Sequence, residues 1–401
     1  MDERSSRGYT LIEVLVTLGV MVVVLVGLLA LLEFNSRVAR AQVNVAGMQQ
    51  SLRVAQAGMV RDLRMAGRGG LPSYRPADPV DPNHYGGMFL PAGAALAVQN
   101  NVPANTVLGG SAAVLPGTDV LTIRGVLSTT FYQVNPTGDG TIGNTGTDSL
   151  IVRGTSPTGV PQNLQALRDA LEGCDGGACP EGLLLVSALN DDIQAVVQLT
   201  GGADVPGGVR LDFTTAGTHG EDYLKLSPNG EFPDALTAVA AVGILEEYRY
   251  YVRDAAPAPS LARARFYPGT ETAYRDTENN LIVDLADNIL DLQLALGIDQ
   301  NNDETITDAG DETDEWLFND PDDVAGDTAL WNAPDRPLYY VRITTLARTD
   351  RLDPRYVSPA IDAIEDRVYN EPETPAVGDE TLARSYRRRQ LTTVVDLRNL
   401  S

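Results

Sequence analysis

The hydrophobic residues of this chain are concentrated in one unbroken run near its start. Val14 to Leu32 are 19 residues without a charge or a proline. At about 1.5 Å of rise per residue, a helix of this length crosses the hydrocarbon core of a membrane. A short polar segment, residues 1–8, precedes it. The pattern predicts a transmembrane segment over about residues 11–32.

Beyond this run the chain keeps a helical period but becomes amphipathic. Apolar residues recur every three or four positions, at Val38, Ala41, Val45, Met48, Leu52, Ala55, Met59, Leu63 and Ala66. The other faces carry Arg37, Arg40, Gln49, Arg53, Gln56, Arg61 and Arg64. The glycines that begin at Gly67, followed by Pro72, then end the helix. We expect one helix over residues 9–66, about 85 Å long, whose second half packs on a head domain. A free coiled coil is the alternative.

Residues 67–401 are predicted to form a β-rich head. A Gly- and Pro-rich connection reaches to about Gly93. Strand-like runs follow at 120–126, 131–134, 149–152, 183–186, 209–213, 248–252, 290–296, 338–346 and 391–397. In the run 290–296, leucines alternate with Asp291, Gln293 and Ala295, which predicts a half-buried strand of an antiparallel sheet. Short helices are expected near 161–172 and 359–369, and 140–260 is compatible with a second subdomain. The predicted fold class is α+β.

Charge and composition narrow the function. The 401 residues include 54 acids and 30 bases, a formal net charge of -24, and all but one of the bases are arginine. Such a surface repels phosphate backbones, so a nucleic-acid partner is not expected. The two histidines, His84 and His219, are isolated in polar or Gly-rich segments. No phosphate-binding loop or nucleophile elbow is present. We therefore expect a protein that is not an enzyme.

Glu13 stands out because it lies within the apolar ramp that leads into the run. A carboxylate in lipid costs roughly 2 to 3 kcal/mol on insertion scales. If the chain were cut after Gly8, Tyr9 would become the N-terminal residue and Glu13 the fifth. The new α-amine of one subunit could then pair with Glu13 of a neighbour, which is worth about 4 kcal/mol at about 4 Å and an effective dielectric near 20. Glu13 is therefore predicted to act in subunit assembly.

The segment Gly8-Tyr9-Thr10-Leu11-Ile12-Glu13, followed by an apolar run, resembles the class III signal of type IV pilins and type II secretion pseudopilins. That resemblance implies cleavage after Gly8 by a prepilin peptidase and N-methylation of Tyr9. The segments NILDLQLALGIDQNND and RRRQLTTVVDLRNL, with the helix end RDLRMAG, are similar to large PilW-like minor pilins. An ordinary secretory signal peptide and a plain membrane anchor are the alternatives for the N-terminus. The apolar run exceeds a signal-peptide core, which disfavours the first.

The resemblance implies a minor pilin that acts in initiation of a type IV pilus or at its tip. A minor pseudopilin of a type II secretion system and a tip adhesin are the alternative functions. The implied partners are other pilins and minor pilins, the prepilin peptidase, the inner-membrane pilus assembly machinery and, before assembly, membrane lipid. The implied location is a single pass through the inner membrane with the head outside the cytoplasm, and then the pilus at the cell surface. Orientation follows from the resemblance, because Asp2 and Glu3 balance the two arginines of the leader, while Arg37 and Arg40 follow the span.

An acidic segment, residues 299–327, contains twelve acids and no base. Oxygen ligands at alternate positions suit Ca²⁺. Side chains of Asp299, Asn301 and Asp303 with the carbonyl of Thr305, completed by Asp308 or Asp311, would supply such a shell. The EF-hand pattern fails after Asp303, because no glycine follows it and Gly310 stands where a bidentate Glu is expected. A solvated acidic loop is the alternative.

Cys174 and Cys179 enclose the tetrapeptide Asp-Gly-Gly-Ala. In an oxidising compartment a disulfide is expected, worth roughly 2 kcal/mol for so short a loop. The rival, half of a zinc site, lacks CxxC spacing and a nearby histidine.

Overall fold

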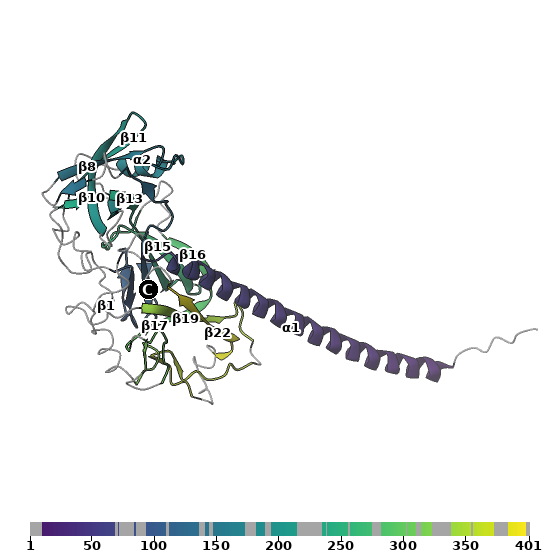
Figure 1. Cartoon of the computed structure of the whole chain (residues 1–401). Coiled ribbons are helices and arrows are strands. Elements are labelled where there is room, and N and C mark those ends of the chain that lie inside the picture. The colour runs from purple at the N-terminus through teal and green to yellow at the C-terminus, as the bar shows by residue number, and fades with distance from the viewer. Residues whose placement is uncertain are drawn as a thin grey trace, which may run out of the picture.

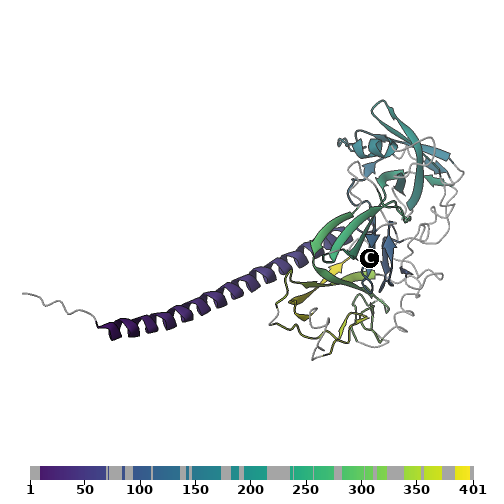
Figure 2. The same ribbon diagram turned by 180° about the vertical axis from the view of Figure 1, so that it is seen from behind.

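The computed structural model is a long helical rod with a β-rich head at one end (Figures 1 and 2). It describes residues 10–68, 71, 84–85, 94–109, 112–135, 141–143, 147–172, 182–188, 194–214, 235–237, 239–255, 257–274, 282–301, 303–309, 314–322, 338–353, 356–372 and 384–397. The head has two lobes. One contains α2, β8, β10, β11 and β13, and the other holds the C-terminal half of the rod.

The rod is helix α1, Leu11–Leu63, a single helix of 53 residues. Its second half lies against strands β16, β19 and β22 of the head. The buried residues of this half follow the predicted stripe and include Met48, Leu52, Ala55, Met59 and Leu63. Gly67 ends the turn after the helix with φ of 67°, a conformation that glycine adopts without strain. The predicted long helix with an amphipathic second half is confirmed.

Two sheets pack against the buried stripe of that half of α1. The six-stranded sheet has the order β1-β2-β5-β14-β15-β16, and the four-stranded sheet has the order β18-β17-β19-β22. Their bounds are β1 His84–Tyr85, β2 Leu96–Gln99, β5 Val120–Gly125, β14 Glu246–Arg253, β15 Ser260–Phe266, β16 Ile282–Asp287, β17 Ile289–Ile298, β18 Trp316–Leu317, β19 Leu338–Arg348 and β22 Arg388–Asp396. One apolar cluster joins the helix to both sheets. The helix is therefore part of the core of this lobe.

The other lobe is a second six-stranded sheet with its own apolar core. Its order is β6-β13-β9-β10-β11-β8, and helix α2 packs on it. The bounds are β6 Tyr132–Gln133, β8 Thr147–Arg153, α2 Gln165–Glu172, β9 Leu183–Ala188, β10 Gln194–Val205, β11 Gly208–Thr214 and β13 Val239–Ile244. Three two-stranded pieces complete the described strands: β12 Ala235–Thr237 with β7 Thr141–Gly143, β20 Ala363–Ile364 with β21 Arg367–Val368, and β3 Val107–Leu108 with β4 Ala112–Ala113.

The strand pairs in the described part of the chain are antiparallel, so the predicted α+β class with an antiparallel head is confirmed. Every predicted strand is present, with its ends moved by at most three residues. The helix expected near 161–172 is present as α2. The longer strands that the sequence did not predict are β2, β10, β13, β15 and β16, and the short strands β1, β3, β4, β7, β12, β18, β20 and β21 were not predicted either. Alternating arginines in β15 and a Gly-Gly pair in β10 weaken the local strand pattern, and pairing with neighbours overrides it.

Strand β17 corrects one prediction, because it is buried on both faces and not on one. Leu292, Leu294 and Leu296 belong to the cluster around α1. On the opposite face, Asp291 and Gln293 are fully buried beneath a polar cover. Asp291 accepts hydrogen bonds there from Arg367 at 2.7 Å and from the Tyr369 hydroxyl at 2.5 Å. Hydrogen-bond partners therefore allow Asp291 and Gln293, the polar residues of the alternating pattern, to be buried.

The segment that carries Arg367 and Tyr369 also differs from its prediction, which was a helix over 359–369. The segment forms the short hairpin β20–β21. Glu365 at its turn has φ of 51°, in the left-handed region. Its carboxylate accepts from Arg342 at 2.7 Å and from Thr344 at 2.6 Å. These tertiary contacts, which local propensity does not contain, determine the conformation.

Candidate functional site

The N-terminus of α1 begins with a capping box built from Thr10 and Glu13. Thr10 adopts an extended conformation, and its hydroxyl accepts from the Glu13 amide at 3.4 Å. In return, Glu13 Oε2 accepts from the Thr10 amide at 2.9 Å and from its hydroxyl at 3.1 Å. This reciprocal pair satisfies backbone donors that a helix start leaves unpaired. The predicted assembly residue thus also starts the helix.

Within the apolar part of α1, the hydroxyl of Thr17 is hydrogen-bonded to the backbone of the preceding turn. The hydroxyl donates to the carbonyl of Glu13 at 2.8 Å and lies 2.9 Å from that of Val14. A threonine that bonds back to its helix can be placed in lipid without an unpaired donor.

The first half of α1 projects from the head without any cover (Figure 1). Its most apolar window of 18 residues has a mean hydropathy of 3.0 and is 0% buried. Among the described residues, α1 is the helix that is long and apolar enough to cross a membrane. So large an exposed apolar surface is unstable in water. It requires an apolar environment around it.

Two buried polar residues, Gln56 and Asp62, fasten the other half of α1 to the head. Gln56 Nε2 donates to the Leu391 carbonyl at 2.7 Å, and Gln56 Oε1 accepts from the Thr393 hydroxyl at 2.5 Å. One turn and a half further on, Asp62 accepts from the Tyr250 hydroxyl at 2.5 Å. Burial, followed by the negative charge of Asp62, raises the pKa of Tyr250, so this hydroxyl remains a donor. The two contacts set the register of the rod on the head.

The acidic segment was predicted to bind calcium. In the structure, the carboxylate of buried Asp299 accepts from the amides of Asp303 at 3.3 Å and Glu304 at 2.9 Å. Asp303 Oδ1 accepts from the Thr305 amide at 2.9 Å. Hydrogen bonds from the hydroxyl and the amide of Thr305 lower the pKa of Asp303 and keep it charged.

Further along the same loop, Asp308 lies 3.2 Å from Arg342. The described residues contain no group of three or more His, Cys, Asp or Glu side chains placed to hold a metal. Asn301 accepts from the Asp303 amide at 2.8 Å, and Asp311 lies outside the described residues. Calcium binding by this loop stays a prediction.

Two family models match the chain, and both agree with this geometry. The prokaryotic N-terminal methylation motif matches residues 4–29, and the model described as type IV pilus-assembly protein W (PilW) matches residues 249–399. Over these two stretches the chain is similar to PilW-like type IV pilin proteins. The first match covers the start of α1, and the second includes β16, β19 and β22, the strands that contact the rod.

Among solved structures, this chain is similar to the type IV-like pilin TTHA1219 from Thermus thermophilus. The identity is 11%, the TM-score is 0.19, and the match covers 59% of this chain and 93% of the other. No curated protein matches the chain. The similarity to type IV pilins therefore rests on the two family models, and the long helix with its β-rich head agrees with it.

Several predicted site residues lie outside the described residues, namely Gly8, Tyr9, Cys174 and Cys179, and so does the isolated His219. Cleavage, methylation and the disulfide stay predictions. His84 lies in β1.

Sequence reasoning missed the role of Gln56, which it assigned to an exposed face. Gln56 is 4% exposed and Asp62 is 1% exposed. One signal was available for each: Gln56 and Asp62 lie next to the apolar positions Ala55 and Leu63 and so border the stripe. Burial of a polar residue there depends on the strand opposite, which the helix pattern does not reveal.

Proposed function

We propose that this chain is a minor pilin that acts in initiation of a type IV pilus or at its tip after prepilin peptidase removes residues 1–8. The observation that carries the proposal is the fully exposed apolar half of α1 on a helix whose other half is locked into the head. A rod of this kind is stable in a membrane and, after extraction, among the rods of other pilins.

Glu13 supports the filament stage. Its Oε2 atom accepts hydrogen bonds from the amide and the hydroxyl of Thr10, which follows the predicted cut by one residue. The carboxylate therefore lies at the start of α1, close in sequence to the predicted cleavage site. Pairing with the amine of a neighbouring subunit would offset the cost of an acid within apolar surroundings.

The head supports a minor role. Two six-stranded sheets and a four-stranded sheet on one rod make a bulky subunit, which suits a position at the end of a filament better than repetition along a thin shaft. The match to a pilus-assembly family favours a pilus over a type II secretion machine. The role is structural, and its partners are other pilins, the prepilin peptidase and the inner-membrane assembly machinery.

Two measurements test the proposal. Mass spectrometry of the mature protein should find Tyr9 at the N-terminus carrying one added methyl group. Deletion of the gene should abolish or strongly reduce surface pili, and complementation should restore them. An intact leader in the functional protein, or normal piliation in the deletion strain with lost type II secretion, would contradict it.

A further inference from the structure

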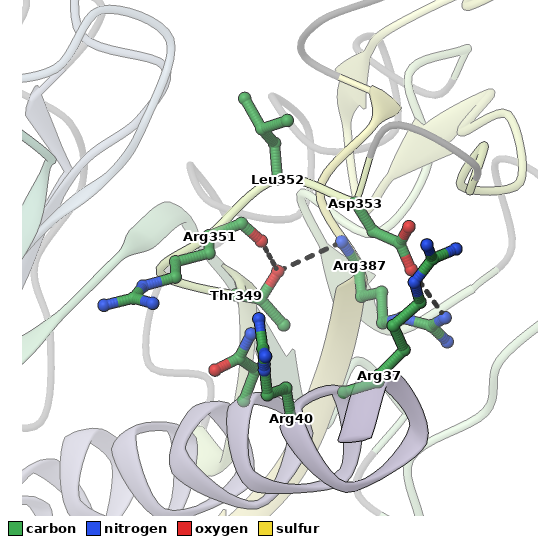
Figure 3. Close-up of a pocket in the computed structure, with 9 residues that line it drawn as sticks. Arg37, Arg40, Thr349, Arg351, Leu352, Asp353 and Arg387 are labelled. Carbon is green, nitrogen blue, oxygen red and sulfur yellow. Dashed lines mark hydrogen bonds and ion pairs between the residues drawn. The ribbon is translucent and has the colours of Figure 1, made fainter. Parts of the chain in front are cut away.

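A cluster of arginines lies where α1 leaves the head. Arg37 and Arg40 of α1 and Arg351 and Arg387 of the head line a cavity of about 400 Å³ together with Ala41, Asn44, Thr349, Leu352 and Asp353. Figure 3 shows Arg37 and Arg40 on the helix below the loop that carries Thr349, Arg351 and Asp353. Segments more than 300 residues apart in the sequence thus form one basic site.

The loop around this cavity has a defined shape. The Thr349 hydroxyl donates to the Arg351 carbonyl at 2.9 Å and accepts from the Arg387 amide at 3.2 Å. The Arg387 guanidinium donates to Asp353 at 3.0 Å and stacks 4.2 Å from the ring centre of Tyr356. The arginines are therefore presented by an ordered frame.

The charge of the lining is unusual for this protein. Four arginines face one acid, Asp353, in a chain whose formal net charge is -24. Arg37 pairs with Glu33 one turn closer to the apolar run, and Asp353 pairs with Arg387. Asp350 is the other acid beside the loop. In the described part of the chain, no acidic side chain pairs with Arg40 or Arg351. One guanidinium nitrogen of Arg40 donates to the Ser36 hydroxyl at 3.0 Å, and its other donors and those of Arg351 can bind an external anion.

The distance of the cluster from the apolar run, measured along the helix axis, indicates which anion would bind there. Arg37 and Arg40 follow Leu32 by about 8 and 12 Å at 1.5 Å per residue. The headgroup layer extends about 5 to 8 Å beyond the hydrocarbon on each side, and long arginine side chains reach further along it. Leu352, 42% exposed, is on the same loop and offers an apolar contact at that level. Guanidinium groups bind phosphate oxygens with paired hydrogen bonds.

We propose that this arginine cluster binds the phosphate of an anionic phospholipid headgroup while the subunit waits in the membrane. Binding offsets the repulsion between the acidic head and the anionic bilayer and holds the base of the head against the surface. The site rests on the membrane stage of the proposed function. Extraction of α1 into a filament would carry the cluster away from the headgroups and release the lipid.

The test uses the full chain in a neutral detergent, with phosphatidylglycerol or phosphatidylcholine added and bound lipid counted by native mass spectrometry. Wild type should bind phosphatidylglycerol in preference, and the preference should fall as salt rises. Arg40→Gln combined with Arg351→Gln should weaken phosphatidylglycerol binding about thirtyfold. The matched control, Arg53→Gln with Arg389→Gln, removes the same charge from exposed positions outside the cavity and should bind as wild type does.

Equal binding of both lipids by wild type, or equal losses in the two double variants, would overturn the proposal. So would full competition by inorganic phosphate at the same concentration, or a preference for polyglutamate over lipid, which would assign the site to a free anion or to an acidic protein partner. Melting of each variant in detergent without added phospholipid reports folding separately. Should lipid preference fail while the mature N-terminus and pilus dependence are confirmed, the lipid site alone is wrong.

Discussion

Gln56, on the N-terminal helix, donates a hydrogen bond of 2.7 Å to the backbone carbonyl of Leu391, on the last strand of the chain. The amide also lies 3.2 Å from the carbonyl of Ile343 on the neighbouring strand. A single side chain thus joins α1 to two strands of the four-stranded sheet. Since α1 is the rod of the subunit, this contact sets how far along the rod the head is placed.

Replacement of Gln56 by alanine should therefore destabilise the head. The Thr393 hydroxyl would lose its acceptor, and loss of the buried side chain would leave a void. We expect a loss of about 1 to 3 kcal/mol of unfolding free energy. Chemical denaturation of the full chain in detergent measures it. The control Gln50→Ala changes an exposed glutamine of the same helix and should alter stability by less than about 0.5 kcal/mol. Similar losses in both variants would show that Gln56 is not a special contact.

Glu13 combines a helix cap and a charge, and two substitutions separate these functions. Glu13→Gln retains an acceptor at the third helical position, as capping boxes allow, but removes the charge. Glu13→Ala removes both. If charge pairing with a freed amine drives assembly, both variants should be lost from sheared pili, as measured by immunoblot. Mass spectrometry should show that both are still cleaved. Normal incorporation of Glu13→Gln would mean that the cap alone matters.

Glu247, on β14 of the six-stranded sheet that packs on α1, is buried between two arginines. Arg124 lies 2.7 Å from it on one side and Arg249 lies 2.7 Å away on the other, and the three side chains are 0% exposed. Burial would raise the pKa of Glu247, but attraction to the arginines outweighs it and lowers the pKa. The carboxylate is therefore charged and compensates two buried cations.

Loss of that charge should be costly. Glu247→Gln would leave both guanidinium groups with less compensation, and we expect about 3 to 5 kcal/mol of destabilisation. Glu271 pairs with Arg249 from a half-exposed position at 2.8 Å. Glu271→Gln should accordingly cost less than about 1 kcal/mol. Denaturant midpoints of the two variants compare them, and an equal cost would contradict the role of burial.

Asp366 makes stability dependent on pH. Burial raises its pKa from 3.8 to about 6, and burial also raises the pKa of the neighbouring Asp119 and Asp291. A carboxyl with a raised pKa binds its proton more tightly in the folded chain than in the unfolded chain. The stabilisation is therefore complete below about pH 4 and is lost as the pH rises through about 6.

Asp366→Asn should remove much of this dependence, because the neutral side-chain carbonyl can still accept from the amides of Asn100 and Asn101, which donate to the wild-type carboxylate at 2.6 and 2.9 Å. At pH 7 we expect the variant to be more stable than wild type by about 1 to 2 kcal/mol, and near pH 4 to be equal to it. Thermal unfolding across this range measures the difference. Asp362→Asn, an exposed control on the same segment, should follow the wild-type curve. A constant difference between Asp366→Asn and wild type would refute the linkage.

Calcium should raise the melting temperature of the full chain if the loop from Asp299 to Asp311 binds it, by an amount that grows with calcium concentration. Asp303→Asn should reduce the shift, because it removes a ligand charge. Asp322→Asn, an acid of the same segment outside the predicted shell, should leave the shift unchanged. Equal shifts with magnesium, or none with calcium, would mean that the segment is a solvated acidic loop.

The sequence alone determined the rod. Its apolar run, its amphipathic continuation and Glu13 are all visible in the local sequence, so the long helix followed without knowledge of the head. The strong strands followed from local runs and alternation of apolar residues. Gln56, the two buried faces of β17 and the hairpin at 363–368 did not follow, since each depends on a partner far along the chain.

The arginine cluster illustrates this division most clearly. Arg37 and Arg40 are visible in the sequence as charges beyond a membrane span, whereas Arg351 and Arg387 carry no local signal at all. Only the packing of α1 against β19 and β22 brings the four side chains around one cavity. Periodicity reports which face of an element is buried, but contacts between distant segments form only once the whole core has folded.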